Sequence, residues 1–541
     1  MGAESPQLPT ATTSSTSAQY TALSSSGNSH LRHPSHARGA AGGTGGRAKR
    51  GSLARCKAAS GALLKRPAGY LSLIGLVVGS LVLYNTTRRE AEQRGDESAS
   101  RDRKETGGGY FGDSFERLSK GWTTSLRRPA SNDDGEWACN PFEANGRLAV
   151  DLETVTNTQW VPYDSRCRPS NLLKDLYRPP GDTLPLIPDA SSATPNPRSF
   201  LPWFRNRTVL LHGDSIDRFH LKDFCEFVGG KLELITPEHR ASPPMWKRPG
   251  ADSARKAREA QWEQRPPEGW ELTNPWVCDI AEYGTTLINV FTWGLQGAEE
   301  FFEMERWYYP PATWTDRMDH ITLPLLPRLA KYLDRPQIEH PDLVILNSGY
   351  WDLRKYTEED FVAAGFPNRP YPEDSPIPYT PLSAAREQTW EREARKAMQH
   401  AATSFKGKDG KAKNGPTLLW RSLHHPPRHN YAPFPRVFQL DSLARKVVSD
   451  LRLSQTTSSS SLTRSPSPAL SQTTSQESTA LSEGEDLGLN HRLRIDESGK
   501  LMLGQEHLFR DLLHPLPVPG SWIWADIMLY ELKRATEGVD R

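Results

Sequence analysis

Residues 208–215 read TVLLHGDS, and this stretch decides the fold. Its first five residues are mostly apolar or β-branched, a composition typical of a parallel strand that is buried on both faces. Gly-Asp-Ser ends the strand, and residues 216–228 then show the apolar side of a helix. Ser215 is therefore expected to open a helix at the carboxyl end of a strand, where open α/β sheets hold their ligands.

Ser215 is a candidate nucleophile, because free N–H groups and the positive end of the helix dipole beside it can stabilise an oxyanion. The alternative is a serine that only caps the helix after a turn glycine. Gly-Asp-Ser is a weak signal by itself, so other motifs of the chain have to separate the two interpretations.

Strand and helix patterns alternate through the rest of the domain. Further buried strands are predicted at residues 285–293, 342–346 and 417–423, with helices at 323–333, 382–405, 437–451 and 521–535. This alternation predicts a doubly wound α/β sandwich. Residues that follow its strands are expected to meet at one edge of the sheet.

A second motif, Asp511-Leu-Leu-His514, supplies a histidine base and a carboxylate to orient it. Three prolines follow within five residues, so the motif is expected in a loop that can reach Ser215. Asp217 and His220 repeat the Asp-x-x-His pattern on the helix after Ser215. His220 would point away from the nucleophile there, so we favour His514 as the base.

Asn347, after the third strand, is expected to donate its side-chain amide to an oxyanion. The alternative is a polar turn in which Trp351 only packs. Arg218 is expected to bind an acyl oxygen or a substrate carboxylate, with a solvated arginine as the alternative. His424 and its neighbour His425 are expected near the substrate and not on a metal, because no carboxylate or cysteine stands at ligand spacing. No cofactor motif is present in the sequence.

Residues 67–84 read PAGYLSLIGLVVGSLVLY and predict a single transmembrane signal anchor. A buried core helix is the alternative, but no neighbouring segment offers it a core. Residues 1–66, which are basic and poor in apolar side chains, predict a disordered cytosolic tail, and residues 85–135 predict a stem. The domain is expected at 136–536, with a disordered Ser/Thr-rich insertion at about 454–485.

Cysteines indicate on which side of the membrane the domain lies. Four cysteines in one lumenal domain suit two disulfides, in any of three connectivities, and Asn206 begins an N-glycosylation motif. Four free thiols in a cytosolic domain are the alternative. We expect a type II membrane protein of the secretory pathway, in the Golgi, with its domain in the lumen. The net charge of +2 is too small to indicate a nucleic-acid partner. These cysteines are Cys139, Cys167, Cys225 and Cys278.

The motifs GDSIDR, NSGYWDL and DLLH stand in the order found in the PC-esterase branch of the SGNH hydrolase superfamily, and the chain resembles that branch over residues 136–535. The branch includes the plant trichome-birefringence-like polysaccharide O-acetyltransferases and fungal and animal relatives. The cysteine-containing segment before GDS, with Trp160 and Tyr163, is also similar. The resemblance implies a three-layer α/β/α sandwich with a mainly parallel sheet.

The resemblance also implies a catalytic triad of Ser215, His514 and Asp511 and an acyl-serine intermediate. The oxyanion hole would combine the Ser215 amide, Asn347 and a glycine after the second strand, either Gly294 or Gly297. Substrate contacts are expected from Arg218, Tyr350, Trp351 and His424.

We expect a membrane-anchored carbohydrate O-acetyltransferase or acetylesterase that acts on a glycan or polysaccharide. The sequence does not identify the acyl donor, and one option is a membrane partner that delivers the acyl group. A lipid-directed esterase and a catalytically inactive glycan-binding domain are the alternatives.

Overall fold

The computed structural model describes residues 139–181, 201–264, 270–296, 299–302, 305, 308–372, 375–427, 429, 431–460 and 486–537. The predicted tail, anchor and stem, and most of the predicted insertion, lie outside these residues. No helix within the described ranges is long and apolar enough to cross a membrane. Residues 454–460, where the sequence predicted disorder, extend a helix instead.

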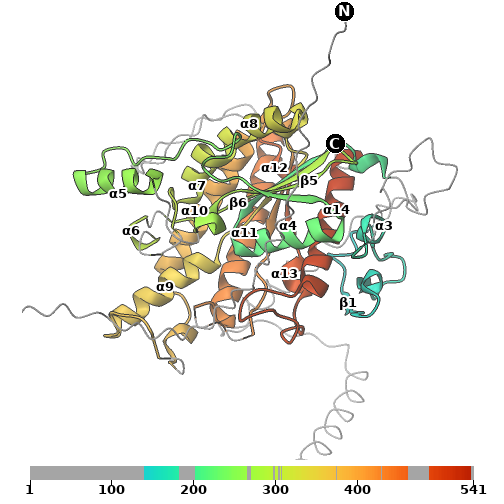
Figure 1. Cartoon of the computed structure of the whole chain (residues 1–541). Coiled ribbons are helices and arrows are strands. Elements are labelled where there is room, and N and C mark those ends of the chain that lie inside the picture. The colour runs from blue at the N-terminus through green and yellow to red at the C-terminus, as the bar shows by residue number, and fades with distance from the viewer. Residues whose placement is uncertain are drawn as a thin grey trace, which may run out of the picture. The chain divides into compact units, whose positions relative to one another are not determined.

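A seven-stranded sheet organises the domain (Figure 1), in the order β4-β5-β6-β3-β7-β8-β9. Five neighbouring strands run parallel, and β4 and β5 form an antiparallel edge. The predicted mainly parallel sheet is therefore confirmed. The parallel strands are β6 Thr285–Phe291, β3 Thr208–Gly213, β7 Leu343–Leu346, β8 Thr417–Arg421 and β9 Leu493–Asp496, and the antiparallel ones are β4 Lys231–Leu234 and β5 Trp276–Ile280.

Helices cover both faces of the sheet. Side chains alternate along each strand, so an entirely apolar strand has an apolar side chain on both faces, and both faces must be shielded from water. In β3, Val209 and Leu211 pack into one apolar cluster and Leu210 into another. The first cluster lies under α3 Leu173–Leu176, α4 Ser215–Phe227 and α14 Trp522–Glu537. The second lies under α8 Leu323–Leu333, α9 Tyr350–Ala363, α10 Ala384–Ser404 and α11 Phe434–Ser460.

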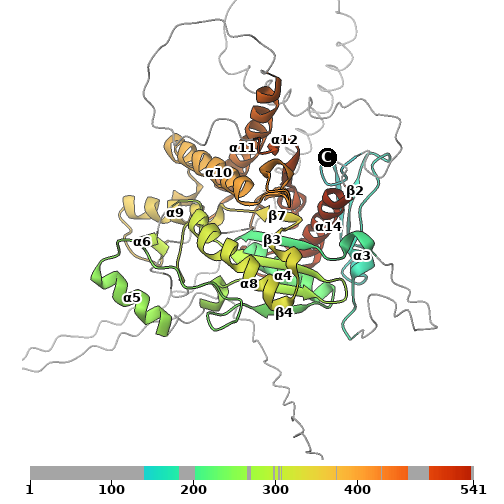
Figure 2. The ribbon, with the colours of Figure 1, turned by 90° about the horizontal axis from the view of Figure 1, so that it is seen from above.

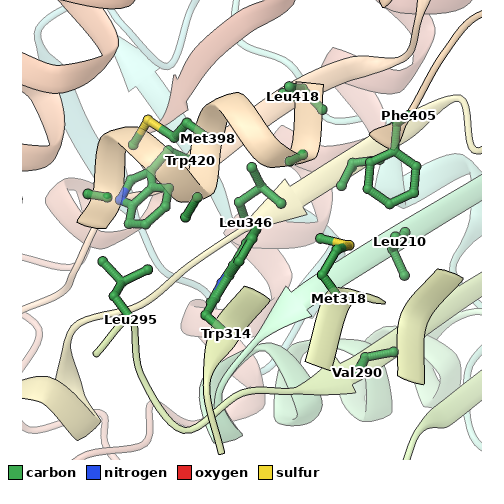
Figure 3. Close-up of a cluster of buried hydrophobic side chains, with 14 of the residues drawn as sticks. Leu210, Val290, Leu295, Trp314, Met318, Leu346, Met398, Phe405, Leu418 and Trp420 are labelled. Carbon is green, nitrogen blue, oxygen red and sulfur yellow. The ribbon is translucent and has the colours of Figure 1, made fainter. Parts of the chain in front are cut away.

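The views agree with this layering, since α10 and α14 lie on opposite sides of β3 and β7 (Figure 2). Figure 3 shows the second cluster, where Leu346 and Leu418 of the sheet lie beside Met398 and Phe405 at α10. Short elements complete the domain: β1 Gly146–Ala149, β2 Gln159–Pro162, α5 Ser253–Gln264, α6 Glu299–Phe302, α7 Trp314–Arg317, α12 Leu489–Arg492 and α13 Ser498–Leu501.

Two disulfides are present, as the cysteine count predicted. Cys139 pairs with Cys167 around the β1–β2 hairpin, and Cys225 of α4 pairs with Cys278 of β5. Asn206, the predicted glycosylation acceptor, is exposed in the turn before β3, with a positive φ of 54°.

Candidate active site

Ser215 stands at the first position of α4, immediately after the end of β3. Asp214 caps this helix by accepting a hydrogen bond from the Ile216 amide at 2.9 Å. Asp217 closes the capping box, because its Oδ2 accepts from the Asp214 amide at 3.1 Å. A Cβ at Gly213 would overlap the Asp217 carboxylate, so the sharp strand-to-helix turn requires glycine there.

The capping box leaves one amide at this turn without a partner. Asp214 accepts from the Ile216 and Asp217 amides, while Asp217 accepts from the Asp214 amide. Among the hydrogen bonds of the described residues, none uses the Ser215 amide. An amide in the first turn of a helix is a suitable donor to an anion, so the nucleophile candidate carries its own oxyanion donor.

Ser215, His514 and Asp511 form a continuous chain of hydrogen bonds. Ser215 Oγ lies 2.8 Å from His514 Nε2, and His514 Nδ1 lies 2.8 Å from Asp511 Oδ2. Because a carboxylate only accepts, Nδ1 carries the ring hydrogen of neutral His514. Nε2 is then free to accept the Ser215 hydroxyl hydrogen, as a general base must.

The electrostatic environment suits these roles. Burial lowers the pKa of His514, and the neighbouring Asp511 carboxylate only partly opposes this shift. For Asp511, burial raises the pKa, but hydrogen bonds from the His514 side chain and from the loop amides outweigh burial and leave the pKa well below its usual range. At neutral pH the base is therefore uncharged and its partner is ionised.

The other Asp-x-x-His pattern serves a different purpose. His220 is buried, its Nδ1 lies 3.0 Å from Ser521 Oγ, and its ring stacks on Trp524 with centroids 4.9 Å apart. Asp217 is occupied by the capping box and by Arg421. The geometry agrees with the preference for His514.

Arg421, at the end of β8, is a site residue that sequence reasoning missed. Its guanidinium donates to both oxygens of Asp217, from Nε at 2.7 Å and from Nη2 at 3.0 Å. Nη2 also lies 3.4 Å from Asp214 Oδ1. Burial raises the pKa of Asp214 to about 6, against the effect of Arg421. An arginine inside the apolar run TLLWRSL was the available signal, because a buried cation needs a buried anion.

Asn347 is not hydrogen-bonded to the candidate nucleophile. It is fully buried, and its Nδ2 donates to the Arg421 carbonyl at 2.9 Å. Gly294 has a φ of +139°, and a Cβ there would lie 2.9 Å from Asp352 Oδ1. Asp352 also accepts from the Leu295 amide at 3.1 Å and so fixes this turn. The oxyanion roles of Asn347 and Gly294 stay predictions, and Gly297 lies outside the described residues.

Tyr350 and His424, two of the four predicted substrate-contacting residues, are too buried to meet a substrate directly, with exposures of 5% and 2%. Tyr350 Oη donates to the His424 carbonyl at 2.6 Å, and His424 Nε2 donates to the Leu513 carbonyl at 2.7 Å. His424 thus supports the loop that carries His514, and Tyr350 supports His424. Tyr350 is the first residue of α9, a helix that the sequence did not predict.

The other two predicted substrate residues belong to an aromatic region next to α4. Arg218 is buried; its guanidinium lies 5.8 Å from the Phe291 ring centroid and donates to the Leu272 carbonyl. The alternative of a solvated arginine is therefore wrong. Trp351 is half-buried and packs edge to face with Trp293, at 4.7 Å between centroids.

The described part of the chain contains no group of three or more histidine, cysteine, aspartate or glutamate side chains arranged to hold a metal ion. Comparison of the sequence and fold with protein-family models, curated proteins and solved structures finds no match. Function is therefore argued from the geometry of the site.

Proposed function

We propose that this protein is a serine acyl-transfer enzyme that works through an acyl-serine intermediate at Ser215. The observation that carries the proposal is the hydrogen-bond chain from Ser215 Oγ through His514 to Asp511, with 2.8 Å at each step. A serine that only capped its helix would have no need of a histidine, and here Asp214 performs the capping. The relation to the SGNH superfamily, in its PC-esterase branch, is part of the same proposal.

The reaction follows from the two ring nitrogens of His514. Ser215 Oγ attacks the ester carbonyl carbon while its proton passes to Nε2, and the Ser215 amide donates to the developing oxyanion. The ester C–O bond then breaks, and the leaving alcohol takes the proton from Nε2. A second hydroxyl then gives its proton to Nε2 and attacks the acyl carbon. The bond from that carbon to Ser215 Oγ breaks, and Oγ takes the proton back from Nε2. Water as this hydroxyl makes an esterase, and a sugar hydroxyl makes a transferase.

A carbohydrate is the acyl acceptor or ester substrate that we favour, with acetyl as the acyl group. The half-buried Trp351 offers an aromatic face to a sugar ring, and the guanidinium of Arg218 packs on Phe291, a ring that Trp351 also contacts. The two disulfides are compatible with a domain in the secretory lumen. The predicted anchor makes the protein a type II membrane enzyme of the Golgi, with the acyl donor supplied in or across the membrane.

A lipid-directed esterase is the second candidate. Leu512, between Asp511 and His514, is 57% exposed, and an apolar side chain at this point suits an acyl chain. Acyl-length preference separates the candidates, since a lipid esterase prefers long chains and a glycan deacetylase or acetyltransferase prefers acetyl.

The test uses the full chain in detergent with chromogenic esters of acetyl and longer acyl groups. We expect acetate release that is lost in Ser215→Ala and in His514→Ala. Ser383→Ala is the matched control, because Ser383 caps α10 through its hydroxyl and lies outside the triad. Added sugar acceptors then sort transferase from esterase. Equal rates for wild type and Ser215→Ala with every ester would overturn the proposal and favour a catalytically inactive glycan-binding domain.

A further inference from the structure

The backbone amides and carbonyls from Leu513 to Pro515, on either side of His514, all take part in hydrogen bonds. Asp511 Oδ1 accepts from the amides of Leu513 and His514, both at 2.7 Å. The carbonyl of His514 accepts from the Arg510 amide at 2.8 Å. These contacts are local to the loop. They fix its shape, but they do not fix its place over the sheet.

Two side chains hold the carbonyl groups on either side of His514. His424 Nε2 donates to the Leu513 carbonyl at 2.7 Å, and Arg510 Nε donates to the Pro515 carbonyl at 2.8 Å. The residue that precedes His514 and the residue that follows it are therefore each held through the backbone carbonyl. No peptide group from Leu513 to Pro515 can turn without breaking one of these bonds.

His424 connects the first carbonyl to the central sheet. It follows β8 by three residues, and its ring packs against those of Tyr350 and Phe509, with 5.3 Å between centroids in both pairs. Its own carbonyl accepts from Tyr350 Oη. Burial lowers the pKa of His424 to about 3, so the ring is neutral and one nitrogen carries its hydrogen. The bond to Leu513 requires that nitrogen to be Nε2.

Arg510 connects the second carbonyl to the helix that carries Ser215. Its Nη2 lies 2.6 Å from Asp223 Oδ2 of α4, and its guanidinium lies 4.4 Å from the ring centroid of Phe219, also on α4. Asp223 Oδ2 accepts a second hydrogen bond, from Ser521 Oγ at 2.6 Å. The ring of Phe219 in turn meets His514 edge to face at 4.7 Å.

We propose that His424 and Arg510 are positioning residues that hold the catalytic base in reach of Ser215. His424 ties the loop to the sheet, and Arg510 ties it to α4. The proposal rests on the function proposed above. Displacing a catalytic group by about 1 Å can reduce a rate about 100-fold. Asp511 is exposed, with 40% of its side chain accessible, and its hydrogen bonds among the described residues all lie within the same loop as His514, so it does not set the distance between His514 and Ser215.

The test measures how fast a fluorophosphonate probe labels Ser215 in the full chain in detergent. His424→Phe keeps a ring but removes the donor, and we expect labelling and kcat to fall at least about tenfold while KM stays within about twofold. His424→Gln keeps an N–H donor. Its labelling rate is expected to recover at least half of the decrease in log rate that His424→Phe shows. His400→Phe is the matched control, since His400 on α10 bonds Asp319 and not the catalytic loop.

A second pair of variants, at Arg510, keeps the test decisive if His424→Phe does not fold. Arg510→Met is expected to slow labelling at least about tenfold, and Arg510→Lys to recover part of it. Wild-type labelling rates in folded His424→Phe or Arg510→Met would overturn the positioning role and leave the acyl-transfer function standing. A wild type that is not labelled at Ser215 would overturn both proposals.

Discussion

Asp214 is the residue that leaves Ser215 available for chemistry. It takes over the capping of α4 that a serine could otherwise perform, and it accepts from the Ile216 and Asp217 amides. The hydroxyl of Ser215 is consequently free to pair with His514, and its amide is left unpaired within the described contacts. Each residue of Gly-Asp-Ser therefore has its own role: Gly213 allows the turn, Asp214 caps the helix and Ser215 is the candidate nucleophile.

His514 is expected to set the pH dependence of the reaction. It accepts a proton only when neutral, so kcat/KM should rise with pH and then level off. Burial lowers the pKa of His514, which places the midpoint below about 6.5, the ordinary histidine value. Asp511→Asn removes the carboxylate that opposes this shift, so the midpoint of its residual activity should move further down. Initial rates across about pH 4 to 8 measure both midpoints; a wild-type midpoint above about 6.5 would contradict this assignment.

At the level of elements, Arg421 joins β8 to the turn between β3 and α4. Its guanidinium reaches Asp217 and Asp214, while its carbonyl accepts from Asn347 after β7. The carboxyl ends of three neighbouring strands are thereby tied together beneath Ser215. This connection explains why Asn347 is buried and bonded to a carbonyl.

Arg421→Met should destabilise the domain strongly. The substitution leaves two buried carboxyl groups without their cation, a change that typically costs about 3–5 kcal/mol. Arg166→Met is the control, because the ion pair of Arg166 with Asp164 is exposed and should contribute little. Urea unfolding monitored by tryptophan fluorescence measures both variants. If Arg421→Met lowered the free energy of unfolding no more than Arg166→Met does, the buried ion pairs of Arg421 would have no structural role.

At the scale of the whole molecule, the site joins parts of the chain that are nearly 300 residues apart. Ser215 opens the helix that follows the first parallel strand in the sequence, while His514 lies in the loop before the last helix. The sheet brings them together because its parallel strands end at one edge. The Cys225–Cys278 disulfide adds a covalent link between α4 and β5, the antiparallel strand that lies between β4 and β6.

Removing that disulfide should lower the stability of the domain. The bond joins residues 53 positions apart, and replacing both cysteines by serine is expected to cost about 2–4 kcal/mol. The matched variant removes Cys139 and Cys167, which are 28 positions apart, and should cost less. Chemical unfolding of both double variants measures the difference. A Cys225–Cys278 variant as stable as wild type would show that packing alone holds α4 on β5.

Long apolar runs predicted the strands well, and shorter polar ones were missed. TVLLH and DLVIL read as buried strands and are β3 and β7. The edge strands KLEL and LRID alternate polar and apolar residues, but each is only four residues long, so the pattern is too short to stand out in the sequence. No helix was predicted at α9, because the residues that precede it, Asn347, Ser348 and Gly349, favour turns.

The sequence by itself determined the α/β class, the central strands and the residue types of the candidate site, because hydrophobic periodicity and short motifs are local properties. Only the tertiary structure decided which of two Asp-x-x-His motifs reaches Ser215, that Arg421 holds the turn, and that His424 faces the catalytic loop. Those contacts join residues 89 to 299 positions apart, and such long-range distances depend on how the strands are ordered in the sheet, which no local pattern records.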